Sequence, residues 1–205
     1  MKSILISIRP HWCEKIVNGE KTIEVRKTAP KEVPFKAFIY CTKTKNKWSL
    51  CDYEGAYQNS KGEIVYAQQH IIGEFICDKI TKYRYTKPWL YNGKRIYHLP
   101  IDTINTCLSY EEIEQYLGNK DGYGLHITAL KIYDKPRALS EFFKPCPDKF
   151  HYCEICKYGS IILSSDEEEY ALYHGGNYDT YETVCCNRVT RPPQSWCYIE
   201  EFMED

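Results

Sequence analysis

Charged residues at fixed spacing mark the first candidate site. Residues 19–26 read Gly-Glu-Lys-Thr-Ile-Glu-Val-Arg, so Lys21, Glu24 and Arg26 stand among residues that favour a strand. A buried strand carries charges only where they are paired or used. Arg26 offers a planar fork suited to phosphate or a base edge, while Glu24 could accept from a base amino group, act as a general base, or hold Arg26. The structural alternative is a Glu24–Arg26 pair that fixes strand register, with Lys21 in solvent.

The elements before this segment are expected to position it. The apolar run 4–8 predicts a strand, and residues 10–18 predict a helix that places Trp12 and Ile16 toward the core. Asn18-Gly19 ends the helix, and residues 21–26 form the second strand. Because side chains alternate along a strand, Glu24 and Arg26 point one way and Lys21 the other, although Lys21 lies at the strand start and could still swing into the same cleft.

Other residues could reach this place from neighbouring strands. Ser7 and Arg9 end the first strand, Tyr40 and Trp196 could each offer a ring for a base to stack on, and Lys43 begins a basic, aromatic-containing stretch. Exposed lysines on a loop are commonly only solvated. The predicted nucleic-acid-binding residues are Ser7, Arg9, Lys21, Glu24, Arg26, Tyr40, Lys43 and Trp196, with Lys21 and Glu24 as the catalytic residues if the protein is an enzyme.

The remaining pattern predicts many strands and few helices. Ser109 followed by Glu112 is a capping-box pattern that opens a short helix ending before Gly118. Strands are expected at residues 35–42, 71–77, 123–133 and 191–199. The predicted fold class is therefore α+β, a small mixed β-barrel with flanking helices.

The cysteines predict a metal site of their own. Eleven cysteines, an odd number without a secretory signal, argue against a disulfide framework. A C-x2-C pair with one cysteine before it and one well after it fits a structural four-thiolate zinc site. The predicted ligands are Cys146, Cys153, Cys156 and Cys186, with Cys185 as the rival for the last place and His151 as a substitute for one thiolate. The alternative is reduced cysteines without metal.

Composition and charge bound the class of protein. The 205 residues suit one domain, residues 1–143 with 188–205, interrupted by a cysteine-rich insertion at residues 144–187. Residues 1–50 carry 11 basic and 4 acidic residues, whereas residues 151–205 carry 3 and 11, so the net charge of −1 hides an asymmetry. The basic segment could face phosphates, or the two ends could simply attract each other. Without a signal peptide or a long apolar run, the expected location is the cytoplasm and no membrane partner is expected.

The charged segment resembles a known family. Gly19-x-Lys21-x-x-Glu24-x-Arg26, together with its preceding strand and helix, resembles the ASCH domain, a PUA-like β-barrel. Segments 39–43, 73–78 and 194–198 are similar to a phage and Firmicutes branch of that family. The resemblance implies RNA binding in a cleft between the first helix and the barrel. Some members resemble amidohydrolases of acylated cytidine that use a threonine nucleophile where Glu24 stands here, and a carboxylate cannot take that role without changing the chemistry. Other members are ribonucleases.

Three functions stay open at this point. The leading hypothesis is a nucleic-acid-binding module for RNA or a modified nucleotide. The first alternative is a hydrolase of a nucleoside or an RNA phosphodiester, with Lys21 and Glu24 as acid/base residues. The second is a protein-interaction module that works through the acidic insertion.

Overall fold

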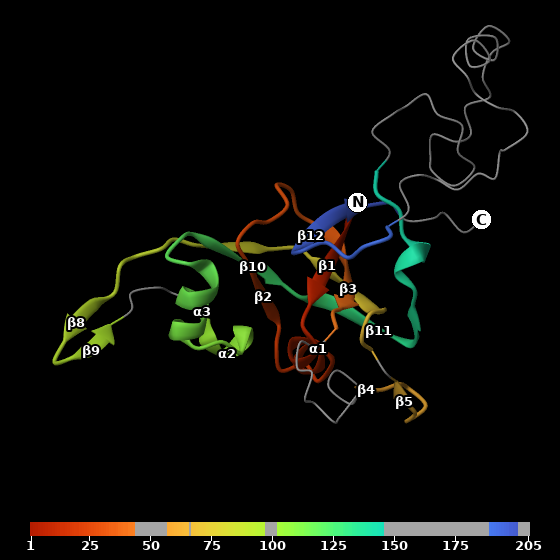
Figure 1. Ribbon diagram of the computed structural model, residues 1–205, viewed down its shortest axis with the longest axis horizontal. Coiled ribbons are helices and arrows are strands. Elements are labelled where there is room, and N and C mark those ends of the chain that lie inside the picture. Colours follow the sequence, from red (N-terminus) through yellow and green to blue (C-terminus); the bar gives the residue numbers. More distant parts are fainter. Residues whose placement is uncertain (44–56, 66, 97–101, 146–188, 201–205) are drawn as a thin grey trace, which may run out of the picture.

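The computed structural model describes residues 1–43, 57–65, 67–96, 102–145 and 189–200. Strands dominate in this part of the chain, and helices are few and short, as Figure 1 shows. The strands are β1 Lys2–Ile8, β2 Ile23–Arg26, β3 Phe35–Cys41, β4 Tyr57–Gln58, β5 Ile64–Val65, β6 Ile71–Cys77, β7 Ile80–Tyr83, β8 Trp89–Tyr91, β9 Lys94–Ile96, β10 Gly122–His126, β11 Thr128–Arg137 and β12 Trp196–Ile199. The helices are α1 Pro10–Val17, α2 Thr103–Thr106 and α3 Tyr110–Leu117, with a 3-10 turn at Leu139–Glu141.

A five-stranded sheet forms the centre of the molecule, in the order β11-β6-β3-β1-β12. Strands β1 and β3 run parallel, with Ile6 opposite Ile39, and the other pairs are antiparallel. Both faces of β1 and β3 are covered, which explains why their sequences read as nearly continuous apolar runs instead of alternating. The predicted strands at residues 4–8 and 35–42 are thus confirmed.

A second sheet, in the order β2-β10-β7, carries the charged segment. Residues 123–133, predicted as one strand, are two, because the chain leaves this sheet after β10, passes Ile127 and joins the large sheet as β11. Ala129 has a positive φ of 45°, and the register of β11 against β6 shifts twice. The strands of the described residues therefore form separate sheets, and they do not close into the mixed β-barrel that the sequence predicted.

Three apolar clusters hold these layers together. The largest lies on one face of the five-stranded sheet and includes Ile16 from α1 and Leu125 from β10. The second covers the opposite face, where Phe142 packs edge-on against Phe38. In the third, α3 places Ile113 and Leu117 against the second sheet. The second sheet therefore packs against the five-stranded sheet through Leu125 of β10, and against α3 through Val25 of its edge strand β2.

The helices that the sequence predicts are present. Helix α1 begins with Pro10 at its first turn and is followed by Gly19 at φ 74°. Helix α3 has the predicted capping box, since Ser109 and Glu112 exchange hydrogen bonds at its N-terminus. None of the helices in the described ranges is long and apolar enough to cross a membrane.

The cysteine-rich insertion lies almost entirely outside the described residues. This applies to all its cysteines, Cys146, Cys153, Cys156, Cys185 and Cys186, and to His151. The zinc site and the division into two units therefore stay predictions.

Candidate functional site

A buried triad of charged side chains stands at the centre of the candidate site. Glu24 lies between two cations, with its Oε2 3.3 Å from Lys21 Nζ and its Oε1 3.0 Å from an amino nitrogen of Arg26. Lys21, Glu24 and Arg26 are only 2%, 6% and 7% exposed. Two positive charges and one negative charge leave this buried group with a net charge of +1.

The other hydrogen bonds of the triad fix its geometry. Lys21 Nζ donates to the carbonyl oxygen of Thr106 at 2.6 Å, and Arg26 donates to the carbonyl oxygen of Ser7 at 2.5 Å. Lys21 Nζ also lies 5.2 Å from the centre of the Trp12 ring, within the range of a cation–π contact. The Nε of Arg26 is buried and has no hydrogen-bond partner among the described residues. A buried donor without a partner is costly to stability.

Local backbone contacts explain how Lys21 reaches Glu24. Strand β2 begins at Ile23, and the backbone N–H of Lys21 still donates to the carbonyl of Lys15 in α1. Thr22 is tied on the other side to Asn105 of α2, through its N–H and through its hydroxyl. Lys21 is therefore not part of the extended strand, and strand alternation does not send it to the opposite face. Of the structural alternative, the Glu24–Arg26 pair is present, but the expectation of a solvated Lys21 is wrong because this side chain is buried.

An open cleft of about 740 Å³ lies over the triad. This volume falls within the range of roughly 300–1,000 Å³ that is usual for small-molecule sites. The ends of β1 and β2, the start of α1, helix α3 and the segment before β12 surround it. The lining residues are Ser7, Ile8, Arg9, Trp12, Lys21, Glu24, Val25, Arg26, Thr42, Lys43, Leu108, Glu112, Gln115, Tyr116, Pro193 and Gln194.

Six of the predicted contact residues line this cleft. Besides the triad, Arg9 and Lys43 are exposed at its surface, and Ser7 contributes to its wall while its hydroxyl donates to the carbonyl of Pro193 at 2.7 Å. The structure brings residues 7 to 43 together here because β1 pairs with β3, and Arg26 of β2 donates to the Ser7 carbonyl at the end of β1.

Tyr40 and Trp196 do not line the cleft, so the prediction that they offer it stacking rings is not supported. Strand alternation turns Tyr40 into the second apolar cluster, on the opposite face of the sheet from Ile39. The indole N–H of Trp196 donates to both the carbonyl and the hydroxyl oxygen of Thr28, at 3.1 Å each.

The aromatic rings of the cleft come instead from the two helices. Trp12 packs partly against the core and also lines the cleft, and Tyr116 of α3 is 37% exposed there. Gln115 and Gln194 add amide groups to the lining. The sequence indicated Trp12 only as a core residue. No local pattern in the segment of α3 indicates that the exposed face of this helix lines a cleft whose other residues come mostly from positions 7 to 43.

Other reactive groups nearby are not suited to catalysis. Burial and the neighbouring Cys41 raise the pKa of the Cys13 thiol well above its usual value, so this cysteine stays neutral and unreactive. Burial lowers the pKa of His126, whose Nε2 is hydrogen-bonded to the Thr81 hydroxyl at 2.8 Å, away from the cleft lining. In the described ranges, no three histidine, cysteine, aspartate or glutamate residues gather as a metal site would require.

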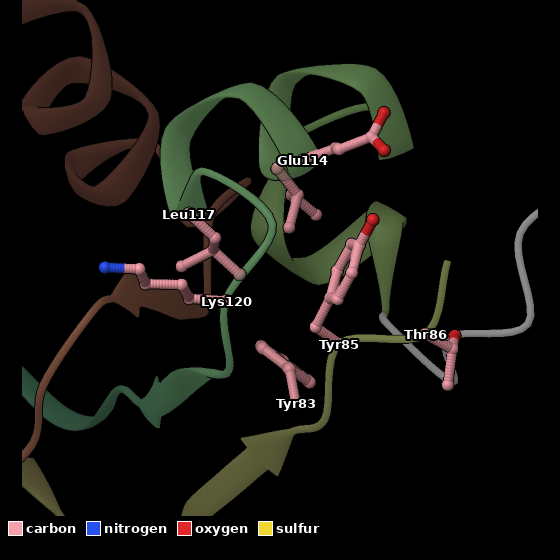
Figure 2. A pocket seen from close by; sticks show the side chains of 7 residues that line it. Tyr83, Tyr85, Thr86, Glu114, Leu117 and Lys120 are labelled. Carbon is pink, nitrogen blue, oxygen red and sulfur yellow. The ribbon is translucent and has the colours of Figure 1, made fainter. Parts of the chain in front are cut away.

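A second pocket is too small to hold a ligand. Figure 2 shows it between α3 and the segment after β7, with Tyr85 and Leu117 among its lining side chains. Its volume of about 10 Å³ is close to the minimum for a single water molecule. Nearby, burial raises the pKa of Tyr83 to about 12, so its hydroxyl stays protonated. The large cleft is therefore the stronger candidate site.

Comparisons with known proteins give a structural likeness but no sequence match. No family model matches the sequence, and no curated protein matches it. A crystal structure of ASCH from Zymomonas mobilis is similar at 15% identity and a TM-score of 0.42, covering 97% of this chain and 88% of that one. A tyrosine-to-phenylalanine variant of the same protein is similar at 15% identity and a TM-score of 0.43, covering 98% and 91%. At this level of likeness, no residue role is transferred from those proteins to this chain.

Proposed function

We propose that this protein is an ASCH-type module that binds single-stranded RNA or a modified nucleotide in the cleft over the charged triad. The observation that carries this proposal is the net charge of +1 buried at the floor of the cleft. A buried charge without full compensation is costly, and an anionic ligand would supply the missing charge. The motif that resembles the ASCH family contributes all three members of the triad.

The chemistry of the lining suits a nucleotide. Arg9 and Lys43 lie exposed at the surface of the cleft, where their positive charge could face phosphate groups. Trp12 and Tyr116 offer rings for a base to stack on, and the amides of Gln115 and Gln194 can both donate to and accept from base edges. A cleft that combines these groups is better suited to a nucleotide than to an apolar ligand or a simple anion.

The hydrolase alternative has less support from the geometry. Each carboxylate oxygen of Glu24 lies against a cation, and Lys21 is engaged with Glu24 and the Thr106 carbonyl. A general base needs an oxygen free to take a proton from the substrate or from water. The arrangement of Lys21 and Glu24 therefore favours a fixed binding surface over acid/base chemistry. The protein-interaction alternative concerns the acidic insertion, outside the described residues.

The proposal is tested by removing charge at the surface of the cleft. Arg9→Ala/Lys43→Ala should lower the affinity for a labelled single-stranded RNA, and the loss should shrink as salt is raised, because both side chains would face phosphates. Fluorescence anisotropy at low and moderate salt measures this. The RNA is recovered afterwards and checked for cleavage.

The matched control is Lys61→Ala/Lys135→Ala, which removes the same charge from exposed positions that do not line the cleft. Equal affinity of the cleft variant and wild type, or an equal loss in the control, would contradict binding in the cleft. RNA cleavage that disappears in Glu24→Gln while this variant stays folded would instead support the hydrolase alternative.

The zinc site is a separate proposal that rests on cysteine spacing alone. We expect protein purified without chelators to contain about one structural zinc ion, held by Cys146, Cys153, Cys156 and Cys186. Elemental analysis should show that Cys156→Ser loses this zinc, whereas Cys197→Ser, in β12, keeps it. Zinc-free wild-type protein that is folded and stable would contradict the proposal.

A further inference from the structure

The hairpin of strands β8 and β9, together with the segment that leads into it, combines positive charge with exposed aromatic residues. Residues 79–96 contain six lysine and arginine residues and no acidic residue. Among them, Arg84, Lys87 and Lys94 are exposed, whereas Lys82 is paired with Asp121 at 3.2 Å. This density of one charge on a short segment is suited to a polyanionic partner.

The geometry of the hairpin gathers its rings on one face. Asn92 and Gly93 form the two-residue turn with φ values of 50° and 75°, and Trp89 pairs with Ile96 and Tyr91 with Lys94. Since residues two apart share a face, Trp89 and Tyr91 lie side by side, with ring centres 6.5 Å apart. Leu90 lies on the other face. The exposed fractions are 52% for Trp89, 71% for Leu90 and 62% for Tyr91.

The hairpin lies at one end of the molecule, beyond α2 and α3, as Figure 1 shows. An isolated two-stranded hairpin is only marginally stable in water, and clustered exposed apolar side chains usually mark a binding surface. An occupant of this surface must therefore offer flat apolar groups to the rings and negative charge to the lysines. Single-stranded nucleic acid has both, because its bases are free to stack and its backbone carries the phosphates.

We propose that the β8–β9 hairpin is a second contact surface for single-stranded nucleic acid, in which bases stack on Trp89 and Tyr91 while Lys87 and Lys94 face the phosphates. This inference extends the proposed function, since it assigns a further contact to the same class of ligand. A mononucleotide would occupy the cleft alone, whereas a longer strand would also engage the hairpin. A duplex would gain less from the hairpin, because its bases are already stacked and paired.

The test compares a uridine oligonucleotide of about 12 residues, a length on the order of known single-strand sites, with uridine monophosphate. Trp89→Ala/Tyr91→Ala should weaken oligonucleotide binding by about tenfold or more, because both rings on which bases would stack are removed. Monophosphate binding should not change. Lys87→Glu/Lys94→Glu should weaken oligonucleotide binding more at low salt than at high salt.

The control is Leu90→Ala, which removes an exposed apolar side chain from the opposite face of the same strand. It should bind the oligonucleotide as wild type does. All these positions are exposed, and circular dichroism checks that the variants fold. Unchanged oligonucleotide affinity in Trp89→Ala/Tyr91→Ala would overturn the inference, and so would an equal loss in Leu90→Ala.

Failure of the hairpin and failure of the cleft give different results. If only the cleft function is wrong, the monophosphate does not bind and Arg9→Ala/Lys43→Ala has no effect, while the hairpin variants still lose the oligonucleotide. If only the hairpin inference is wrong, Arg9→Ala/Lys43→Ala binds both the oligonucleotide and the monophosphate more weakly. The hairpin variants then bind both ligands as wild type does. An acidic peptide tests for a protein partner. If the hairpin variants no longer bind this peptide but still bind the oligonucleotide as wild type does, the inference is overturned.

Discussion

At the floor of the cleft, one buried carboxylate lies between two cationic side chains. Glu24 holds Lys21 and Arg26 in place, and both are also fixed by backbone carbonyls. Because all three side chains are buried, the stability lost on replacing one of them depends on which buried charges are left behind. Removing Glu24 leaves two buried cations, whereas removing Lys21 leaves a neutral Glu24–Arg26 pair.

This asymmetry predicts an order of stability. Glu24→Gln should lower the free energy of unfolding by about 3–5 kcal/mol, the cost of leaving buried charges uncompensated. Lys21→Met, which keeps a flexible apolar chain in the same place, should lower it by clearly less. Chemical denaturation of both variants measures the difference. Equal losses of stability would show that the carboxylate does not compensate both cations.

At this scale the sequence predicted the triad but not its surroundings. Three charges in a strand-like segment had to be paired or used, and they are paired in the structure. Trp12 was assigned to the core alone. Helical periodicity identifies the apolar face of α1, but it does not show that part of this face opens into a cleft. Tyr40 was assigned to the site because alternation alone does not tell which face of a central strand meets a cleft.

Short elements position these residues, and α2 is the most consequential of them. Its Thr106 carbonyl accepts from Lys21, and its Asn105 binds Thr22. Asp102 caps this helix by accepting from the backbone N–H of Asn105 at 2.9 Å. The backbone and side-chain amides of Asn105 both donate to the Asp102 carboxylate, and these hydrogen bonds hold the pKa of Asp102 below its ordinary value of 3.8.

The cap predicts a pH-dependent contribution to stability. Asp102→Ala should lower the free energy of unfolding by about 1 kcal/mol at neutral pH. Because the folded-state pKa of Asp102 is depressed, its stabilisation is present above 3.8 and is lost as the pH falls through the lower folded value. The difference between wild type and variant should therefore shrink in strong acid. Denaturation at several pH values measures it.

Asp102→Asn is the matched control, since asparagine caps helices about as well as aspartate and does not titrate. It should keep most of the stability at neutral pH. A loss as large as that of the alanine variant would show that the charge, and not the cap, matters.

The sequence predicted the longer elements better than the short ones. Helices α1 and α3 carry start and stop signals of their own, and both are present. No strand was predicted within residues 82–100, because their apolar residues recur with no clear period. The pair Asn92-Gly93 is nevertheless a turn signal that could have indicated the β8–β9 hairpin. The break at Ile127 had no such signal, because the chain changes sheets there through contacts with distant strands.

Over the whole molecule, charge is unevenly placed along the chain. The cleft is built mostly from the basic first 43 residues, so the net charge of −1 does not describe the surface that a ligand meets. Removing one lysine that faces a phosphate should make the salt dependence of single-strand binding shallower by about 0.7 in the slope of log K against log salt.

Lys43→Ala should show this shallower slope for a single-stranded RNA, because Lys43 lies at the surface of the cleft. Lys61→Ala, on the turn between β4 and β5, should keep the wild-type slope. Affinity measured by anisotropy over a series of salt concentrations gives both values. Equal slopes of log K against log salt for wild type and Lys43→Ala would show that this lysine does not contact a phosphate.

The most direct test of the proposed function is calorimetric titration of uridine monophosphate into wild type and Lys21→Met. We expect wild type to bind, and Lys21→Met to bind at least about tenfold more weakly while staying folded, because this substitution removes the net positive charge and leaves the Glu24–Arg26 pair. Equal affinity of the two folded proteins would contradict the central claim that the buried charge of the triad holds the ligand.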